Sequence, residues 1–387
     1  MKPIVCGKFS GNYFIANRLG RNKGAVISKN IFDFLKKLSS ENANIPNQVA
    51  IFLSKLGLLV SLSQKIDDLF VFLTPTETKP YGVISYEITE RCNFSCIHCV
   101  LGKKKSKREL TIAKKREIIK RIFDSGCVYL KITGGEPLLA TGFDKVYSFA
   151  HRLGLLVKIQ TNGSLIALSK NQKLFEEFTP HKIVISLYGA TKKSYETLTR
   201  SPGSFNKFLE AIKWLKNSRI STRINIIITS YNEHEVDEMV RMAKESNSEY
   251  FIYTRLTPTF QKETAPMNFM SHDCPLLNRV KRYNQESFAR TPDEEFEQCL
   301  AGKSSFHVDS IGNVMICQSS RKKIFNLLKQ NKDNFAELVM ASDLLLKKPD
   351  FCQTCEFKKD CSICSVGLDL YKKAHKIPFY VCKKYGS

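Results

Sequence analysis

The chain has 387 residues, of which 43% are hydrophobic and 25% are charged, so it is long enough for two or three domains and too apolar for wholesale disorder. Lys and Arg outnumber Asp and Glu by 60 to 37, which gives a net charge of +23. This charge suits an acidic partner such as a nucleic acid, an acidic peptide or an acidic electron donor. Surplus lysines spread over solvated helix faces would also produce it.

The N-terminal sequence MKPIVCGKFS lacks the apolar core of a signal peptide, and the most apolar run, residues 49–62, is too short to span a bilayer. We therefore expect a cytoplasmic protein without a membrane anchor. Thirteen cysteines in such a protein favour metal ligation over disulfides, because the cytosol keeps thiols reduced. Ten of them lie in two dense groups, and only Cys6, Cys127 and Cys274 stand apart.

Two polar stretches that contain prolines, residues 74–80 and 257–275, divide the chain into three segments. They predict an N-terminal domain over residues 1–74, a middle domain over 80–257 and a Cys-rich C-terminal domain over 275–387. In the first of these, a strand pair at 8–18, helices at 29–38 and 46–56, and a second β ribbon at 58–73 make a small winged-helix pattern.

The middle segment alternates short β-branched runs with amphipathic helical patterns six times. The predicted strands are 82–89, 127–133, 155–161, 182–187, 223–229 and 250–254, and the helices between them include 112–124, 143–152, 204–216 and 233–244. Repeated β/α units predict a parallel sheet with right-handed crossovers, either open or curled into a barrel. A polar motif follows every strand, so all six motifs should converge at the edge where parallel α/β folds carry their chemistry.

The first two of these motifs are the most informative. Cys92, Cys96 and Cys99 form CxxxCxxC directly after the first strand, and three thiolates on so short a loop can hold three irons of a cubane and leave the fourth iron open. A closed zinc site would need a fourth ligand, and only His98 is near. Forty residues further on, the sequence TGGEP at 133–137 places glycines where a backbone can approach a ligand closely.

Together these motifs resemble the radical SAM superfamily from residue 82 to about residue 256. The resemblance implies an α/β fold with a partial (β/α)6 TIM-like barrel, a [4Fe-4S] cluster whose open iron chelates S-adenosylmethionine (SAM), and a 5'-deoxyadenosyl radical that abstracts hydrogen from a substrate. It also implies contacts with SAM by Gly134, Gly135, Glu136, Ser186 and Arg200, with Asn162 near the same mouth. Ordinary loop residues remain the alternative interpretation of Arg200 and Asn162. His98 stands where the family usually has an aromatic residue, and we expect it to pack beside the adenine.

The C-terminal segment holds seven cysteines, which exceed one tetrahedral zinc site: Cys299, Cys317, Cys352, Cys355, Cys361, Cys364 and Cys382. Their arrangement resembles the SPASM extension of radical SAM enzymes and departs from it only in the two residues between Cys361 and Cys364. By that resemblance Cys299, Cys317 and Cys364 serve a first auxiliary [4Fe-4S] cluster, and Cys352, Cys355, Cys361 and Cys382 serve a second, for three clusters in total. Cys274 or a substrate group would complete the first. A zinc-binding domain remains the alternative.

Auxiliary clusters of this kind would remove an electron from a substrate radical, which points to a net oxidation, with flavodoxin or ferredoxin as the expected electron donor. The N-terminal segment resembles the PqqD-like domains that hold leader peptides as an added β-strand, and residues 8–18 are the candidate edge. The sequence thus predicts an oxidoreductase that matures a ribosomally made precursor peptide by forming a thioether or carbon-carbon crosslink.

Two other functions stay open. One is a sulfatase-maturing enzyme, but in that relative an Asp follows the second auxiliary-site cysteine, and here Gln318 follows Cys317. The other is a nucleic-acid-binding or peptide-binding cluster protein without catalysis. The second predicted helix, PNQVAIFLSKL, carries one Lys and few side chains suited to reading bases, which disfavours nucleic acid.

Overall fold

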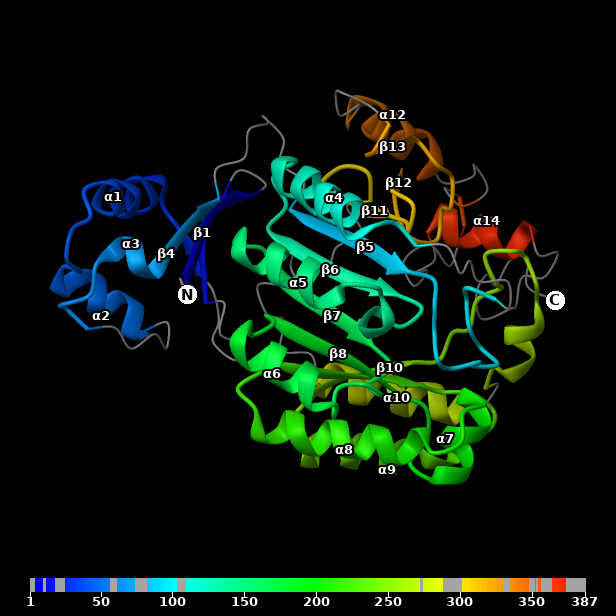
Figure 1. The fold of residues 1–387 in the computed structure, drawn as a ribbon. Helices are drawn as coiled ribbons and strands as arrows, with labels where there is room; N and C mark the ends of the chain where they lie inside the picture. The colour runs from blue at the N-terminus through cyan, green and yellow to red at the C-terminus, as the bar shows by residue number, and fades with distance from the viewer. Residues whose placement is uncertain are drawn as a thin grey trace.

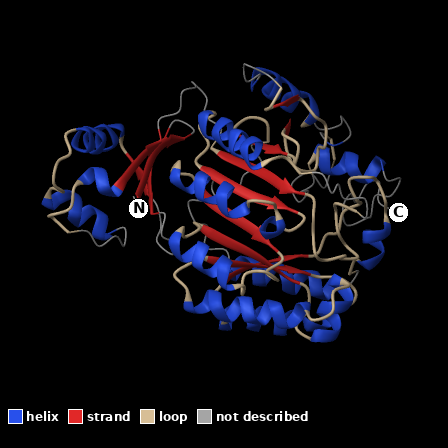
Figure 2. Cartoon of the chain, in the orientation of Figure 1, coloured by secondary structure: helices blue, strands red, loops and turns tan. Residues whose placement is uncertain are grey.

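The computed structural model describes residues 4–9, 12–17, 25–55, 61–73, 82–102, 109–271, 274–287, 301–329, 335–347, 352, 354–355 and 364–373. These residues form a small N-terminal sheet with helices, a large central sheet covered by helices, and a C-terminal part beside the end of the central strands (Figure 1). Figure 2 shows the same arrangement by type of secondary structure. Within these ranges, no helix is both long and apolar enough to cross a membrane.

The central sheet contains the six parallel strands that the alternating pattern predicts. They are β5 (Val83–Thr89), β6 (Tyr129–Gly134), β7 (Leu156–Thr161), β8 (Lys182–Leu187), β9 (Thr222–Ile227) and β10 (Glu249–Tyr253). Each of these strands pairs in parallel with the next. The predicted α/β class with a parallel sheet is therefore confirmed, and every strand ends at the same edge.

Three short strands that the sequence patterns did not predict extend this sheet. β11 (Ser305–Val308) pairs in parallel with β5, and β12 (Asn313–Met315) and β13 (Phe325–Asn326) continue it in antiparallel fashion. The C-terminal part of the chain is thus hydrogen-bonded to the first strand of the barrel. The proposed domain boundaries themselves stay predictions.

Helices cover the outer face of the sheet (Figure 1). They are α4 (Ile112–Asp124), α5 (Phe143–Arg152), α6 (Ser169–Glu177), α7 (Lys192–Thr199), α8 (Ser204–Asn217), α9 (Val236–Glu245) and α10 (Cys274–Ser287), with short 3-10 turns at Pro137–Leu139, Glu233–Glu235 and Ala265–Phe269. The C-terminal part adds α12 (Phe335–Leu345) and α14 (Ser365–Lys373). Apolar side chains at helical spacing decide which face of each helix is buried, as in α4, where Ile118, Ile119 and Ile122 enter the main core.

The alternation of side chains along β5 separates the core from the inner face of the barrel. Ile84, Tyr86 and Ile88 belong to the main apolar core together with α4. Because successive side chains of a strand point to opposite faces, Ser85 and Glu87 lie on the other face. The inner face of β5 is thus polar.

The N-terminal domain has a four-stranded sheet in the order β3-β2-β1-β4. Its strands are β1 (Ile4–Phe9), β2 (Asn12–Asn17), β3 (Ala25–Ile27) and β4 (Phe70–Leu73), and its helices are α1 (Lys29–Ser40), α2 (Asn47–Lys55) and α3 (Ile66–Leu69). Ser28 caps α1, since its hydroxyl accepts a hydrogen bond from the Ile31 backbone N–H at 3.2 Å.

Two predictions for this domain were wrong. The described strands within residues 8–18 are inner strands of the sheet and not its edge, because β1 pairs with β2 and β4, and β2 pairs with β1 and β3. Residues 58–73 contain no β ribbon in their described part: Ile66 and Leu69 are buried three residues apart on one turn of helix, and β4 pairs in parallel with the distant β1. Among the described strands, β3 and β4 form the edges.

The N-terminal sheet packs against the barrel through a small apolar cluster. Val5 and Phe14 contact Val128, Tyr129 and Leu156, which lie at the beginnings of β6 and β7. The N-terminal domain therefore sits at the opposite end of the barrel strands from the loop that carries Cys92 (Figure 1).

Candidate functional site

The cysteine loop after β5 is held in place by backbone hydrogen bonds to the neighbouring loops. The Ser95 and Ile97 backbone N–H groups donate to the carbonyls of Thr199 and Leu198, at 3.1 and 3.0 Å. Phe94 is buried beneath the loop. This leaves the thiols of Cys92, Cys96 and Cys99 half-buried at the mouth of the barrel, on a loop whose backbone is already fixed.

These surroundings fit an iron-sulfur cluster. The hydroxyl of Tyr195 is buried and has no hydrogen-bond partner among the described residues. Burial raises the pKa of Tyr195, and the nearby Cys96 thiol and Glu136 raise it further. A site that receives additional acceptor atoms, such as sulfides, would contain a buried donor of this kind beside Cys96, because those atoms would accept its hydrogen bond. In the described part of the chain, no three His, Cys, Asp or Glu side chains converge as ligands of one metal ion. A cubane does not require such convergence, because each thiolate binds a separate iron.

The glycines of TGGEP fix the position of the cysteine loop. Gly134 has φ of +151°, and a Cβ atom there would lie 2.2 Å from the Thr89 carbonyl oxygen. At Gly135 a Cβ atom would lie 2.3 Å from the Arg91 carbonyl oxygen, and the Gly135 backbone N–H donates to the Thr89 carbonyl at 2.8 Å. The close backbone approach that the sequence predicted is thus an approach to the start of the cysteine loop.

Gly135→Ala is therefore expected to move the cysteine loop. We expect the rate of 5'-deoxyadenosine formation from SAM to fall roughly a hundredfold, because a displacement of about 1 Å at a reacting centre has an effect of that size. The rate and the iron content of the reconstituted protein are the measurements. Gly203→Ala is the matched control: Gly203 also has positive φ, +76°, but nothing lies within 4 Å of its added Cβ. Wild-type rates and iron content in Gly135→Ala would contradict the structural role assigned to this glycine.

Glu136 turns its carboxylate into the protein. It is fully buried and accepts hydrogen bonds from the Thr161 hydroxyl at 2.7 Å and from the backbone N–H groups of Asn162 at 2.8 Å and Leu138 at 3.1 Å. Burial raises the pKa of Glu136 to about 7, against these bonds. Its side chain joins the end of β6 to the end of β7. Any contact of Glu136 with SAM must therefore be made by the backbone of Glu136.

Asn162 likewise supports the cysteine loop. Its amide nitrogen donates to Asn93 Oδ1 at 3.0 Å and lies 3.9 Å from Cys92 Sγ, and its oxygen accepts from the Ser164 backbone and hydroxyl at 2.9 and 2.7 Å. The donor toward sulfur stabilises a thiolate at Cys92.

The remaining predicted SAM residues lie at the ends of β8 and α7. Ser186 is part-buried and hydrogen-bonds to Tyr188, whose pKa is raised well above its usual value by burial and by Cys96. Arg200 caps α7 in the left-handed region, with φ of +50°, and its side chain is exposed at the rim. His98 packs 5.1 Å from the Tyr188 ring, and burial lowers its pKa to about 4, so it is neutral. These residues share one mouth with the cysteine loop.

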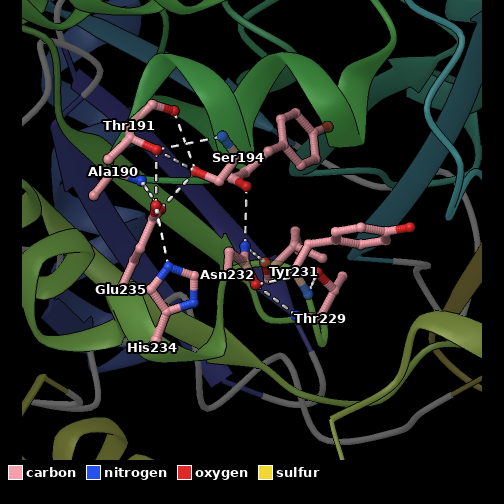
Figure 3. A network of polar contacts seen from close by, with 10 residues as sticks. Ala190, Thr191, Ser194, Thr229, Tyr231, Asn232, His234 and Glu235 are labelled. Atoms are coloured by element: carbon pink, nitrogen blue, oxygen red, sulfur yellow. Dashed lines mark hydrogen bonds and ion pairs between the residues drawn. The ribbon is translucent and has the colours of Figure 1, made fainter.

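A network that sequence reasoning missed fixes the turn after β8 (Figure 3). The Glu235 carboxylate accepts hydrogen bonds from the Ala190 backbone N–H at 2.7 Å, the Thr191 hydroxyl at 2.8 Å and the Ser194 hydroxyl at 2.6 Å. Burial opposes its ionisation, but these bonds outweigh burial and lower the pKa of Glu235. Asn232 donates to the Tyr188 carbonyl at 2.9 Å. The only sequence signal was the position of TSYNEHE after a strand.

A second missed carboxylate lies behind the cysteine loop. Glu109 accepts from Lys115 Nζ at 2.8 Å, from the Thr141 backbone N–H at 2.8 Å and from the Thr89 hydroxyl at 2.5 Å, and it lies 3.5 Å from Arg91 Nη1. Burial favours the protonated acid, but the bonds from Lys115, Thr89 and Thr141 outweigh it and lower the pKa of Glu109 to about 2. It ties β5, α4 and the loop after TGGEP together.

The predicted auxiliary ligands are placed in part. Cys317, Cys352, Cys355 and Cys364 are half-buried in the C-terminal part. Cys299, Cys361 and Cys382 lie outside the described residues, and for Cys274, in α10, the side chain does also. Cys6 and Cys127 are buried in apolar cores, which raises the pKa of both thiols and marks them as packing residues.

Residues 86–243 match the Radical SAM superfamily. With the cysteine loop and the glycine motif together at the mouth of a parallel barrel, these residues form a radical SAM domain, and the chain is an enzyme. Such a domain implies a [4Fe-4S] cluster and SAM.

Its relatives include synthases and maturases. The chain is 24% identical to the AdoMet-dependent heme synthase of Methanosarcina barkeri over 320 residues, which span 73% of this chain and 90% of that protein. It is 31% identical to the mycofactocin maturase MftC of Mycolicibacterium smegmatis over 180 residues, 46% of this chain and 45% of that protein. Streptococcus suis SuiB bound to S-adenosylmethionine superposes with a TM-score of 0.62 at 17% identity, covering 93% of this chain and 94% of SuiB, which establishes a shared fold. SuiB has also been solved bound to its precursor peptide SuiA.

Proposed function

We propose that this enzyme is a peptide maturase that oxidatively crosslinks a ribosomally made precursor peptide through a thioether or carbon-carbon bond. The observation that carries the proposal is the position of the N-terminal domain. This domain has a sheet with open edge strands and packs at one end of the radical SAM barrel, whereas the cysteine loop lies at the opposite end. A long substrate held at the first end can extend to the second. The maturase MftC among the sequence relatives and the peptide complex of SuiB support a peptide substrate.

Within this function the residues of the mouth have separate tasks. Cys92, Cys96 and Cys99 hold three irons, and when bound the cluster and SAM supply a 5'-deoxyadenosyl radical that takes hydrogen from the peptide. The backbone of residues 134–136 would bind the SAM amino group, Ser186 the ribose and Arg200 the carboxylate, for which an exposed guanidinium at the rim is suited. Asn162 acts on the cluster side, through Cys92.

The C-terminal cysteines are proposed to hold two auxiliary clusters. Half-burial of Cys317, Cys352, Cys355 and Cys364 keeps these thiols available while excluding most water, which suits cluster ligation. We assign Cys299, Cys317 and Cys364 to one cluster and Cys352, Cys355, Cys361 and Cys382 to the other, with Cys274 or the peptide completing the first. The net charge of +23 favours docking of an acidic flavodoxin or ferredoxin.

The leader peptide is proposed to add a strand to β3. This edge presents Val26, whose side chain is 64% exposed, while the predicted strands β1 and β2 are already paired on both sides. An exposed apolar side chain on an unpaired sheet edge is what strand addition uses for affinity. The PqqD-like assignment of this domain belongs to the same proposal.

Val26→Asp is expected to weaken leader binding at least tenfold, because burial of a Val side chain contributes roughly 1.5–3 kcal/mol and a charge removes that gain. Fluorescence anisotropy of a labelled precursor, encoded by a short neighbouring open reading frame, measures the affinity. Ile51→Asp is the matched control, since Ile51 is 54% exposed on α2 of the same domain and away from the edge. Equal affinities for wild type and Val26→Asp would exclude β3 as the docking edge.

Haem synthesis is the second candidate, because the alignment with the Methanosarcina barkeri protein covers 90% of that relative. A haem product absorbs strongly near 400 nm and a crosslinked peptide does not, so an absorption spectrum of the products decides between the two. Two earlier alternatives are less favoured. Gln318 after Cys317 still argues against sulfatase maturation, and the exposed face of α2 ends in a single charged residue, Lys55, which is poorly suited to nucleic acid.

A further inference from the structure

A buried polar network on the inner face of the barrel has no part in the site described so far. It joins Ser85 and Glu87 of β5 to His307 of β11 and to Arg321. His307 is paired with Ser85 in the register of the sheet, so both side chains leave the same face. Glu87 and His307 are both fully buried.

The contacts form a chain of four groups. The Ser85 Oγ atom lies 2.7 Å from His307 Nδ1, and His307 Nε2 lies 3.4 Å from Glu87 Oε2. Arg321 Nη2 donates to the same Glu87 oxygen at 2.9 Å, and its guanidinium stacks on the Phe260 ring at 3.9 Å. The order serine, histidine, carboxylate is the one that activates a hydroxyl in many hydrolases.

The charges around His307 fix its proton. Burial lowers the pKa of His307 and Arg321 and Lys131 lower it further, against the effect of Glu87, so the ring is neutral at pH 7. Burial opposes the ionisation of Glu87, but His307 and Arg321 outweigh it and lower the pKa of that carboxyl. A ring proton on Nε2 faces the Glu87 carboxylate at 3.4 Å but makes no hydrogen bond to it in this structure. The lone pair of Nδ1 then accepts the Ser85 hydroxyl proton.

The network is incomplete in a way that points to a ligand. Glu87 Oε1, His307 Nε2 and Arg321 Nε are all buried without a hydrogen-bond partner among the described residues. An unpaired buried carboxylate oxygen costs about 1–3 kcal/mol, and such costs concentrate at functional sites. Glu87 precedes Cys92 by five residues, no more than about 17 Å of chain, and Arg321 follows Cys317 by four. The network is therefore close along the chain to the cysteine loop and to a proposed auxiliary ligand.

We propose that Ser85, His307 and Glu87 form a proton relay that removes a proton from the bound peptide. The inference rests on the proposed function, because an oxidation that joins two peptide groups releases a proton besides the abstracted hydrogen atom. A thiol, hydroxyl or amide X–H bond of the peptide breaks, X keeps the electron pair, and the proton passes to Ser85 Oγ as the Ser85 proton moves to His307 Nδ1. The imidazolium is then held between Ser85 and the Glu87 carboxylate.

A hydroxyl polarised in this way also reacts with organophosphorus reagents, which provides a test without peptide or SAM. Diisopropyl fluorophosphate is added to the anaerobically reconstituted protein. The Ser85 oxygen forms a bond to phosphorus, fluoride leaves, and His307 takes the proton. We expect one adduct, at Ser85 by peptide mass spectrometry. His307→Gln should slow its formation roughly a hundredfold, the contribution of a general base. Glu87→Gln should slow it less, and Ser85→Ala should abolish it.

The matched control is His151→Gln. His151 is also buried, but its Nε2 contacts the Thr179 carbonyl at 3.1 Å on the outer helix α5, so the labelling rate should not change. Unfolding temperature and iron content identify variants that fail to fold. The wild-type rate alone gives a further measure: it should rise with pH through one ionisation below the ordinary His pKa of about 6.5, because only neutral His307 accepts the proton.

Three outcomes would overturn the relay: no adduct at Ser85, an equal rate in folded His307→Gln, or a wild-type rate that does not change with pH. Each is independent of the proposed function. If the wild-type enzyme labels at Ser85 but converts no precursor peptide, the maturase assignment fails and the activated serine stands. If it converts peptide but does not label, the relay fails and the maturase assignment stands.

Discussion

Replacing Cys92, Cys96 and Cys99 together by Ala is expected to abolish 5'-deoxyadenosine formation from SAM. No other described cysteine shares the loop after β5 with them, so no thiolate remains there to hold the irons. With three cubanes, anaerobically reconstituted wild-type protein should contain about twelve irons per chain and the triple variant about eight. Iron, sulfide and zinc analysis, with chromatography of the nucleoside product, measures both effects.

Cys127→Ala is the control for this experiment, because Cys127 is buried in the core and burial raises the pKa of its thiol. It should keep the full iron content. About four irons with stoichiometric zinc in the wild type would contradict the auxiliary-cluster proposal. The protein would then be a radical SAM enzyme with a structural C-terminal part and without an internal electron acceptor.

Glu109→Gln is expected to lower the free energy of unfolding by about 3–5 kcal/mol, the usual effect of removing one partner of a buried ion pair. Lys115 is fully buried, and the substitution leaves its ammonium opposite a neutral amide. The loss should carry over to the cysteine loop, because Glu109 also holds Thr89 and lies beside Arg91. Urea unfolding gives the stability, and iron content gives the effect on the loop.

The pH dependence of this loss separates charge from packing. The pKa of Glu109 is lowered from 4.5 to about 2, so its stabilisation is complete above about pH 4.5 and disappears as the pH falls toward 2. The difference between wild type and variant should shrink over that interval. Glu117→Gln is the control: Glu117 pairs with Arg121 on the exposed side of the same helix and should cost less than about 1 kcal/mol. A difference that is constant from pH 7 to pH 3 would exclude the electrostatic explanation.

Local patterns predicted the parts of this fold that repeat. Each barrel strand has its own β-branched run, and α4 and α5 begin and end at the predicted residues. The N-terminal domain was harder, because Ile66 and Leu69 lie in a four-residue helix, too short for its period to stand out. The pairing of β4 with β1 joins residues more than 60 positions apart, and no local pattern carries that information.

The same distinction between local patterns and long-range contacts applies to the candidate site. Residues in compact motifs, such as Cys92, Cys96 and Cys99, were predictable because their spacing alone limits the chemistry. Glu109, Glu235 and Glu87 were not, because each acquires its role from partners on other elements. The predicted contact of Glu136 with SAM illustrates the limit: its motif was found, but only packing determines that the carboxylate points inward.

The hydrogen bonds between β11 and β5 have a consequence for protein engineering. Without residues 301–329, β5 would become the outermost strand of a long parallel sheet and would present unsatisfied amides and carbonyls to other molecules. The C-terminal part is therefore not a detachable module. Chimaeras that exchange the C-terminal part between homologues should be joined within α10, before β11, and should include the whole β11–β13 segment. Otherwise the exposed edge of β5 will cause self-association and not altered specificity.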